Sequence, residues 1–185
     1  MKKNTLKKVL VGVGVVIGIP LSVITIPAVG IRYAFMKRAI RTGKVDGWIQ
    51  EVNSYIPYEI KDTIPAPAYV EDDKSKMYIR ISDQDLMSAA VAPIKFKTAV
   101  QAIIAHEVGH VLDEDLDYIQ QVIQQHIRNR NYESYRSMVL YREQRAWELG
   151  KKVAPNKAYY DKYNKTNMAK YKELMALEKP EWGGR

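Results

Sequence analysis

Two histidines, His106 and His110, stand four positions apart in an almost wholly apolar run from Thr98 to Leu112. If this run is a helix, both imidazoles lie on one face, one turn apart, where they can bind the same metal ion. Glu107, next to the first histidine, can then reach a water on that metal, which is the H-E-x-x-H arrangement. Imidazoles and a carboxylate inside a buried helix are costly if they stay unpaired. Metal binding removes that cost; the alternative is that the histidines form hydrogen bonds to backbone groups of the core.

A third metal ligand is predicted at Glu143, in a long helix expected over 133–152. On this helix Glu143 falls in the apolar stripe, whereas Glu148 points about 140° away and is expected in solvent. A carboxylate on a buried face needs a partner, and the two histidines supply one through a shared metal. The alternative is an ion pair with Arg142 or Arg145. The apolar stripe around Glu143 comprises Val139, Leu140, Ala146, Trp147 and Gly150.

The segments His-Glu-Val-Gly-His (106–110) and Glu-Gln-Arg-Ala-Trp-Glu-Leu-Gly (143–150) together resemble the layout of gluzincins. In these zinc peptidases, a glutamate three positions before an alanine on a downstream helix gives the third ligand. Over about 98–150, the chain is similar to compact bacterial and phage peptidases that cleave phage repressors. It is more distantly similar to membrane-embedded peptidases with H-E-x-x-H and E-x-x-A-D motifs. The resemblance implies Zn²⁺ as cofactor, a protein or peptide substrate, the ligands His106, His110 and Glu143, and Glu107 as catalytic base.

Several positions near the motifs qualify this resemblance. Trp147 stands where an Asp or Asn often occurs, so no carboxylate that would orient a histidine is identified. Leu116, six positions after His110, excludes a metzincin, which has a histidine there. Gly109 allows another backbone or side chain to approach the metal helix closely, or serves simple close packing. The donor that would stabilise an oxyanion stays unassigned among four residues, namely His126, Tyr132, Tyr135 and Tyr141.

Composition narrows the classes of function. The chain has no cysteine, which excludes a disulfide scaffold, a thiolate zinc site and a cysteine nucleophile. Its net charge of +8 arises largely in residues 1–44, which hold nine Lys and Arg and no acidic residue. The rest of the chain has 20 basic and 21 acidic residues. Because the excess charge flanks an apolar segment, nucleic acid is not predicted as a partner.

Residues 9–31 form an uncharged run of 23 residues after the basic head 1–8. As a helix this run measures about 34 Å, enough to cross a hydrocarbon core of about 30 Å. We predict a retained single-pass membrane anchor that contacts lipid. The alternatives are a signal peptide cleaved after 28–30, in which case the protein is secreted, and a buried core helix. Basic residues balance across the run, so they do not predict the side of the membrane.

The elements around the metal helix follow from local signals. A juxtamembrane helical region is expected over 32–56, broken at Gly43 and Gly47, followed by a proline-containing loop over 57–67. Strands at 68–70 and 77–81 are predicted to form an antiparallel hairpin. The second of these strands is a candidate edge strand for binding a substrate backbone, or a purely structural edge. A short helix is expected over 83–92.

The acidic run 113–117 is expected to end the metal helix, and Asp117 is predicted to cap a helix over 118–129. In the tail, tyrosines alternate with lysines; we interpret it as a helix that packs its tyrosines and leaves its lysines in solvent, and the alternative is RNA or membrane binding.

The whole chain is therefore predicted to be α+β: a mostly helical zincin-like domain with a short antiparallel sheet, preceded by one transmembrane helix. Its parts are the head 1–8, the anchor 9–31, the juxtamembrane region 32–56, the metallopeptidase domain 57–155 and the basic tail 156–185. The predicted function is that of a membrane-anchored zinc endopeptidase. The alternative is a catalytically silent, membrane-tethered binding protein with the same fold.

Overall fold

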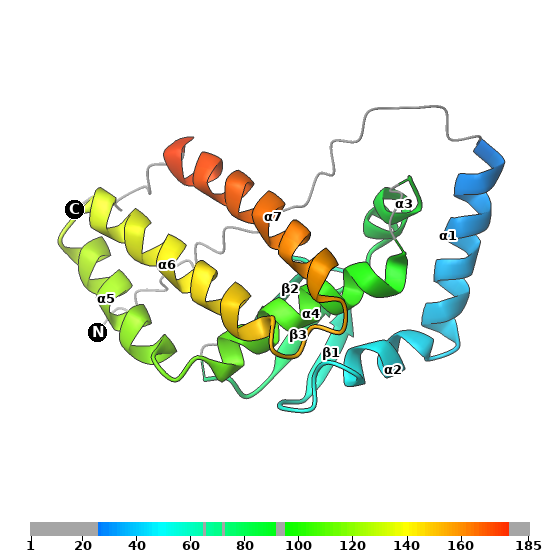
Figure 1. The fold of residues 1–185 in the computed structure, drawn as a ribbon, viewed down its shortest axis with the longest axis horizontal. Coiled ribbons are helices and arrows are strands. Elements are labelled where there is room, and N and C mark those ends of the chain that lie inside the picture. The colour runs from blue at the N-terminus through cyan, green and yellow to red at the C-terminus, as the bar shows by residue number, and fades with distance from the viewer. Residues whose placement is uncertain (1–25, 65, 72, 92–94, 178–185) are drawn as a thin grey trace, which may run out of the picture.

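The computed structural model describes residues 26–64, 66–71, 73–91 and 95–177 (Figure 1). The predicted basic head and most of the predicted anchor lie outside the described residues. The described part contains helices α1 (Ile26–Arg41), α2 (Lys44–Gln50), α3 (Asp83–Val91), α4 (Phe96–Leu112), α5 (Leu116–Arg128), α6 (Tyr132–Gly150) and α7 (Lys157–Leu177), and strands β1 (Tyr58–Lys61), β2 (Ala68–Val70) and β3 (Met77–Arg80).

Helix α4 is the central element of the molecule (Figure 1). It packs against α6, α2, α7 and strand β2. Because apolar residues surround nearly its whole circumference, it is buried on several sides, as the sequence predicted. The residues that it contributes to the main core include Val100, Ala102, Ile104, Ala105 and Val108.

The strands form a three-stranded mixed sheet in the order β1-β3-β2. Strands β2 and β3 pair antiparallel, with Tyr69 opposite Tyr78, which confirms the predicted hairpin. Strand β1 pairs parallel with β3, placing Tyr58 opposite Met77. The prediction of a loop throughout 57–67 and of a purely antiparallel sheet was therefore wrong. A four-residue strand between prolines gives little local signal, and its parallel partner lies 19 residues further along the chain.

The central position of β3 also corrects the candidate role of 77–81 as an edge strand. Its backbone is paired on both sides, so it has no free edge for a substrate. Of the described strands, β1 and β2 lie at the edges, and β2 is the one that packs against α4. A peptide backbone that added to this sheet beside α4 would therefore pair with β2.

Helices α1 and α2 occupy much of the region predicted as juxtamembrane. Gly43, at φ 68°, separates them in the left-handed conformation that glycine adopts without strain. The second predicted break, Gly47, is instead inside α2. None of the helices in the described part of the chain is long and apolar enough to cross a membrane. Residues 26–31 of the predicted anchor form the start of α1, and residues 9–25 lie outside the described part.

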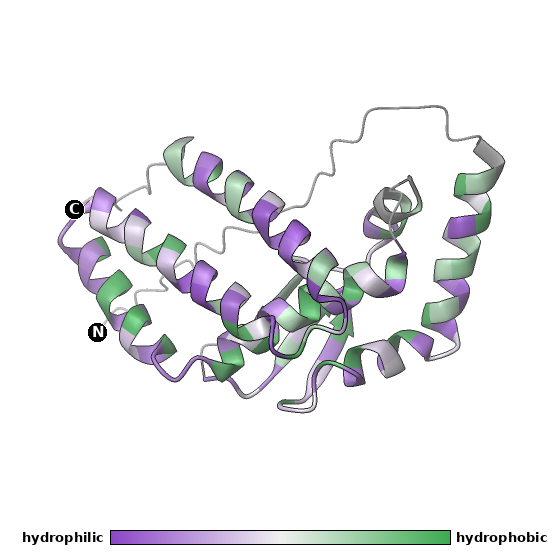
Figure 2. Cartoon of the chain, in the orientation of Figure 1, coloured by the Kyte–Doolittle hydropathy of each residue, from purple (hydrophilic) through white to green (hydrophobic). Residues whose placement is uncertain are grey.

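Helices α5, α6 and α7 enclose a second core cluster, and Figure 2 shows the hydrophobic residues of α5 gathered on one side of that helix. Helix α5 begins at Leu116 after Asp115, so the predicted cap at Asp117 was wrong. Helix α7 packs against α6 and α4 and buries tyrosines while many of its lysines are exposed. The residues of the second cluster are Ile119, Ile123, Val139, Tyr171 and Met175.

Candidate metal centre

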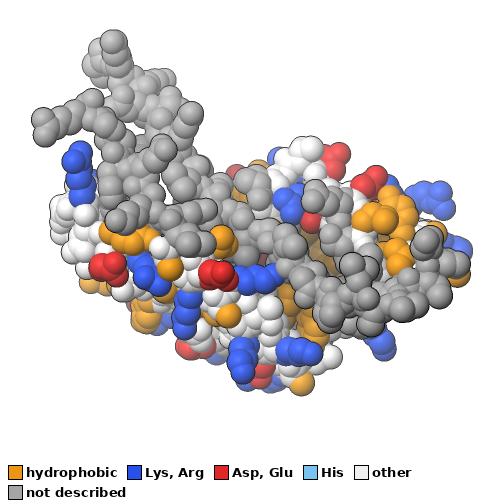
Figure 3. All heavy atoms as spheres, turned by 90° about the horizontal axis from the view of Figure 1, so that it is seen from above, with side chains coloured by type: hydrophobic (Ala, Val, Ile, Leu, Met, Phe, Trp, Pro, Cys, Tyr) orange, Lys and Arg blue, Asp and Glu red, His pale blue; other side chains and the backbone are white. Residues whose placement is uncertain are grey.

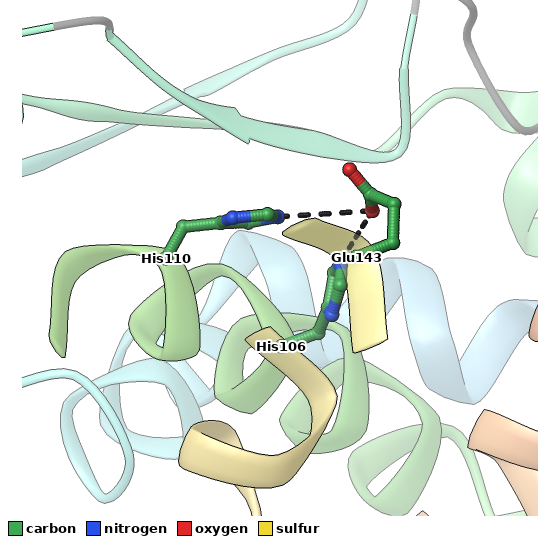
Figure 4. Close-up of side chains that lie close together, drawn as sticks. All are labelled: His106, His110 and Glu143. Carbon is green, nitrogen blue, oxygen red and sulfur yellow. Dashed lines mark ion pairs between the residues drawn. The ribbon is translucent and has the colours of Figure 1, made fainter. Parts of the chain in front are cut away.

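The three predicted ligand residues converge in the structure (Figure 4). His106 and His110 project from one face of α4, with ring centroids 4.8 Å apart, and Glu143 reaches them from α6. The Oε2 atom of Glu143 lies 3.3 Å from His106 Nε2 and 3.7 Å from His110 Nε2. One ligand atom from each residue can be chosen so that all three lie within 4.8 Å of one another.

The two distances between the carboxylate and the imidazoles fit a shared metal ion. Two ligand atoms bound at about 2.0–2.1 Å to a tetrahedral ion are about 3.3 Å apart, close to the two observed carboxylate–imidazole distances. Two imidazole nitrogens and one carboxylate oxygen are a donor set that zinc accepts, and they leave a fourth position for water or substrate. All three side chains are nearly buried, with exposed fractions of 11–13%.

Close packing of α4 on α6 brings Glu143 to the histidines. A Cβ atom on Gly109 would lie 1.9 Å from the carbonyl oxygen of Ala146, so only glycine fits at this point of the crossing. One turn further along α6, a Cβ atom on Gly150 would lie 2.0 Å from the carbonyl oxygen of Ala105. The backbones therefore touch at two points of each helix, spaced by one turn. The sequence pointed to this close approach at Gly109.

The second oxygen of Glu143 is held by Arg142. The Nε and Nη2 atoms of Arg142 donate to Glu143 Oε1 at 3.1 and 2.8 Å, and its Nη1 donates to Gln120 on α5. Burial raises the pKa of the Glu143 carboxyl, but Arg142 and the histidines outweigh burial and hold this pKa well below its usual range. The sequence offered two interpretations of Glu143, an ion pair with an arginine and a metal shared with the histidines. In the structure Arg142 pairs with one carboxylate oxygen, and the other oxygen faces the two histidines.

The ring of His106 is positioned by stacking. Trp147 lies one turn after Glu143 on α6, and its ring stacks on the imidazole with centroids 4.2 Å apart and planes 26° from parallel. The buried Nδ1 of His106 has no hydrogen-bond partner among the described residues. Trp147 therefore orients the imidazole by stacking, in place of the carboxylate that often follows the alanine in related motifs. A signal for this role was present in the sequence, since Trp147 shares the core-facing stripe with Glu143.

Glu107 is buried beside the three converging residues, with 8% of its surface exposed. Burial raises the pKa of its carboxyl to about 7; the charge of Glu143 adds to this effect and that of His106 opposes it. A carboxyl that titrates near neutral pH can both accept and donate a proton in a reaction. This property suits the role that the sequence motif gives it.

His126 does not join this cluster, because it is outside the group of three His, Asp or Glu residues in the described part whose ligand atoms lie close enough to share a metal. Tyr141 is 48% exposed, and the hydroxyl of Tyr132 donates to the backbone carbonyl of Met175 on α7. Glu148 is exposed, as its position on the helix predicted.

Comparisons with protein-family models, with curated proteins and with solved structures find no match for this chain.

Proposed function

We propose that this protein is a zinc-dependent endopeptidase attached to a membrane through residues 9–31. The observation that carries this proposal is the convergence of His106, His110 and Glu143 beside a buried glutamate, Glu107. When bound, zinc polarises a peptide carbonyl and makes water a nucleophile at neutral pH. The two imidazoles and Glu143 would hold the ion. Glu107 would accept the proton of the attacking water at its carboxylate and deliver it to the leaving amine.

The sheet offers a binding mode for the substrate. Strand β2 lies at an edge of the sheet and packs against α4, the helix that carries both histidines. An extended peptide can add to such an edge through backbone hydrogen bonds, which requires no particular side-chain sequence. We therefore propose a protein or peptide substrate bound along Ala68–Val70 and not a nucleic acid.

A specific observation supports a second candidate, a silent binding protein with the same fold. Arg142 already compensates the charge of Glu143, so the buried carboxylate has a partner without any metal. In such a protein the cluster would be purely structural. The presence of Glu107 favours the enzyme, because a structural metal site needs only ligands, whereas hydrolysis needs a base.

The test is the zinc content of the purified full-length chain in detergent, for the wild type and four variants. We expect about one zinc per chain in the wild type, in Glu107→Gln and in the control His126→Ala, and much less in His110→Ala and Glu143→Ala. The wild type and the control should cleave unfolded protein substrates, and Glu107→Gln should not. Zinc without cleavage in the wild type would support the binding protein. Folded wild-type protein that takes up no zinc would contradict the metal centre itself.

A further inference from the structure

The outward face of α1 is apolar from Ala28 to Phe35. Ile31 and Phe35 lie four positions apart, and so on one side of the helix, and they are 72% and 58% exposed. The residues between and before them on the same side, Ala28 and Ala34, are also exposed. Among the large hydrophobic residues of the described part, Ile31 is the most exposed.

The opposite face of α1 is fixed to the body of the protein. Met36 is 2% exposed and forms a small core with Leu86 and Ala90 of α3. Lys37 forms an ion pair with Asp83 at the start of α3, and α1 also packs against α2. The exposed apolar side chains are therefore on a helix anchored to the folded domain.

Exposed arginines follow this apolar face along α1. Arg38 and Arg41 are exposed one and two turns after Phe35, and residues 26–45 contain no acidic residue. At the α1 end of the molecule, on the right of Figure 3, hydrophobic and basic side chains lie next to each other on the surface. The uncharged run 9–31 leads directly into this helix. Apolar and aromatic residues followed by arginines are the order found where a chain leaves the hydrocarbon and passes the headgroups.

We infer that the outward face of α1 lies in the interfacial layer of an anionic lipid bilayer, with Ile31 and Phe35 among the acyl chains and with Arg38 and Arg41 at the phosphates. A second copy packed on this face with its α1 parallel would bring the arginines of both copies together, which opposes that arrangement. This inference rests on the membrane attachment proposed for residues 9–31 and adds that the domain is docked on the bilayer in one orientation.

The absence of cysteine allows one site to be labelled at a time. The full-length chains of Phe35→Cys and Tyr118→Cys would each carry an environment-sensitive fluorophore and be reconstituted in vesicles of phosphatidylcholine and phosphatidylglycerol. Tyr118 is a suitable control because it is 67% exposed on α5, at the other end of the molecule from α1 (Figure 1). We expect a blue-shifted label at position 35 whose emission falls about twofold when the lipids carry nitroxides, and neither effect at position 118.

The contribution of the two arginines to membrane docking is tested with a second pair of variants. The change Arg38→Glu with Arg41→Glu should reduce the quenching at position 35, whereas Lys162→Glu with Lys165→Glu on the exposed side of α7 should leave it unchanged. A label at 35 that stays in water while the protein floats with the vesicles would overturn the docking and leave the attachment through 9–31 intact. A blue shift without quenching by nitroxide lipids would show that protein covers this face, and would overturn the inference too.

Discussion

The two carboxylate oxygens of Glu143 have different neighbours. Oε2 faces His106 and His110, whereas Oε1 accepts both hydrogen bonds from Arg142. The arginine keeps the carboxylate ionised and leaves one oxygen directed at the histidines. The sequence predicted Glu143 through its place on the helical stripe. It could not choose between metal and arginine, because the position of Arg142 depends on Gln120 of another helix.

The first prediction is that zinc can replace the positive charge that Arg142 places beside Glu143. In metal-free protein, Arg142→Met should lower the free energy of unfolding by about 3 kcal/mol, because a buried carboxylate loses its cation. Zinc bound at the proposed centre would supply positive charge at the same carboxylate, so saturating zinc should stabilise this variant more than the wild type. Chemical denaturation in detergent, with a chelator and with zinc, measures both quantities.

The matched control is Arg145→Met on the same helix. Arg145 pairs with Asp113, whose side chain is fully buried, through bonds of 2.6 and 2.9 Å. This variant should also be destabilised, but zinc should stabilise it only as much as the wild type. Equal zinc effects in both arginine variants would mean that Arg142 and the metal act on Glu143 independently.

At the scale of elements, the crossing of α4 and α6 sets the spacing of the centre. The apolar run 98–112 and the helix expected over 133–152 match α4 and α6 within two residues at each end, and the stripe on α6 predicted which face is buried. It did not predict how closely the helices approach, which is decided by the absence of a side chain at Gly109 and Gly150. Likewise, the strand-forming Tyr, Ile and Val residues of 68–70 and 77–81 predicted a local hairpin, whereas β1 is defined by a long-range parallel partner.

The second prediction is that Gly109→Ala separates these two helices. The new Cβ would meet backbone atoms of Ala146 and Gly150, which cannot rotate away as a side chain can. We expect a loss of unfolding free energy of about 3 kcal/mol, together with a zinc content well below that of the wild type, because Glu143 moves with α6. The matched control is Gly47→Ala in α2, where a Cβ meets no atom within 4 Å. That change should stabilise the protein by about 0.5–1 kcal/mol with full zinc content. Unchanged zinc in a folded Gly109→Ala protein would contradict the role of the crossing.

At the scale of the whole molecule, α7 completes the domain from outside the segment that carries the motifs. Tyr160 is 1% exposed and its ring lies 5.0 Å from that of Trp147, while Tyr171 is 8% exposed against α5 and α6. The alternation of tyrosine and lysine fits a helix with one packed face and one solvated face. The sequence alone left nucleic-acid binding as an alternative, because the same pattern provides aromatic and basic side chains for either purpose.

The third prediction separates these two uses of α7 with neighbouring residues. Tyr171→Ala should lower the free energy of unfolding by about 3 kcal/mol, because the ring fills the second core cluster and burial raises the pKa of its hydroxyl well above the usual value. Lys172 is exposed, so Lys172→Ala should change stability by no more than about 0.5 kcal/mol. Thermal and chemical unfolding measure both effects. Zinc content should fall in Tyr171→Ala and stay unchanged in Lys172→Ala, because the ring of Tyr171 lies near Arg142 and Glu143. If instead Tyr171→Ala left stability intact and Lys172→Ala weakened binding to single-stranded RNA, α7 would be a binding element and the domain would end at α6.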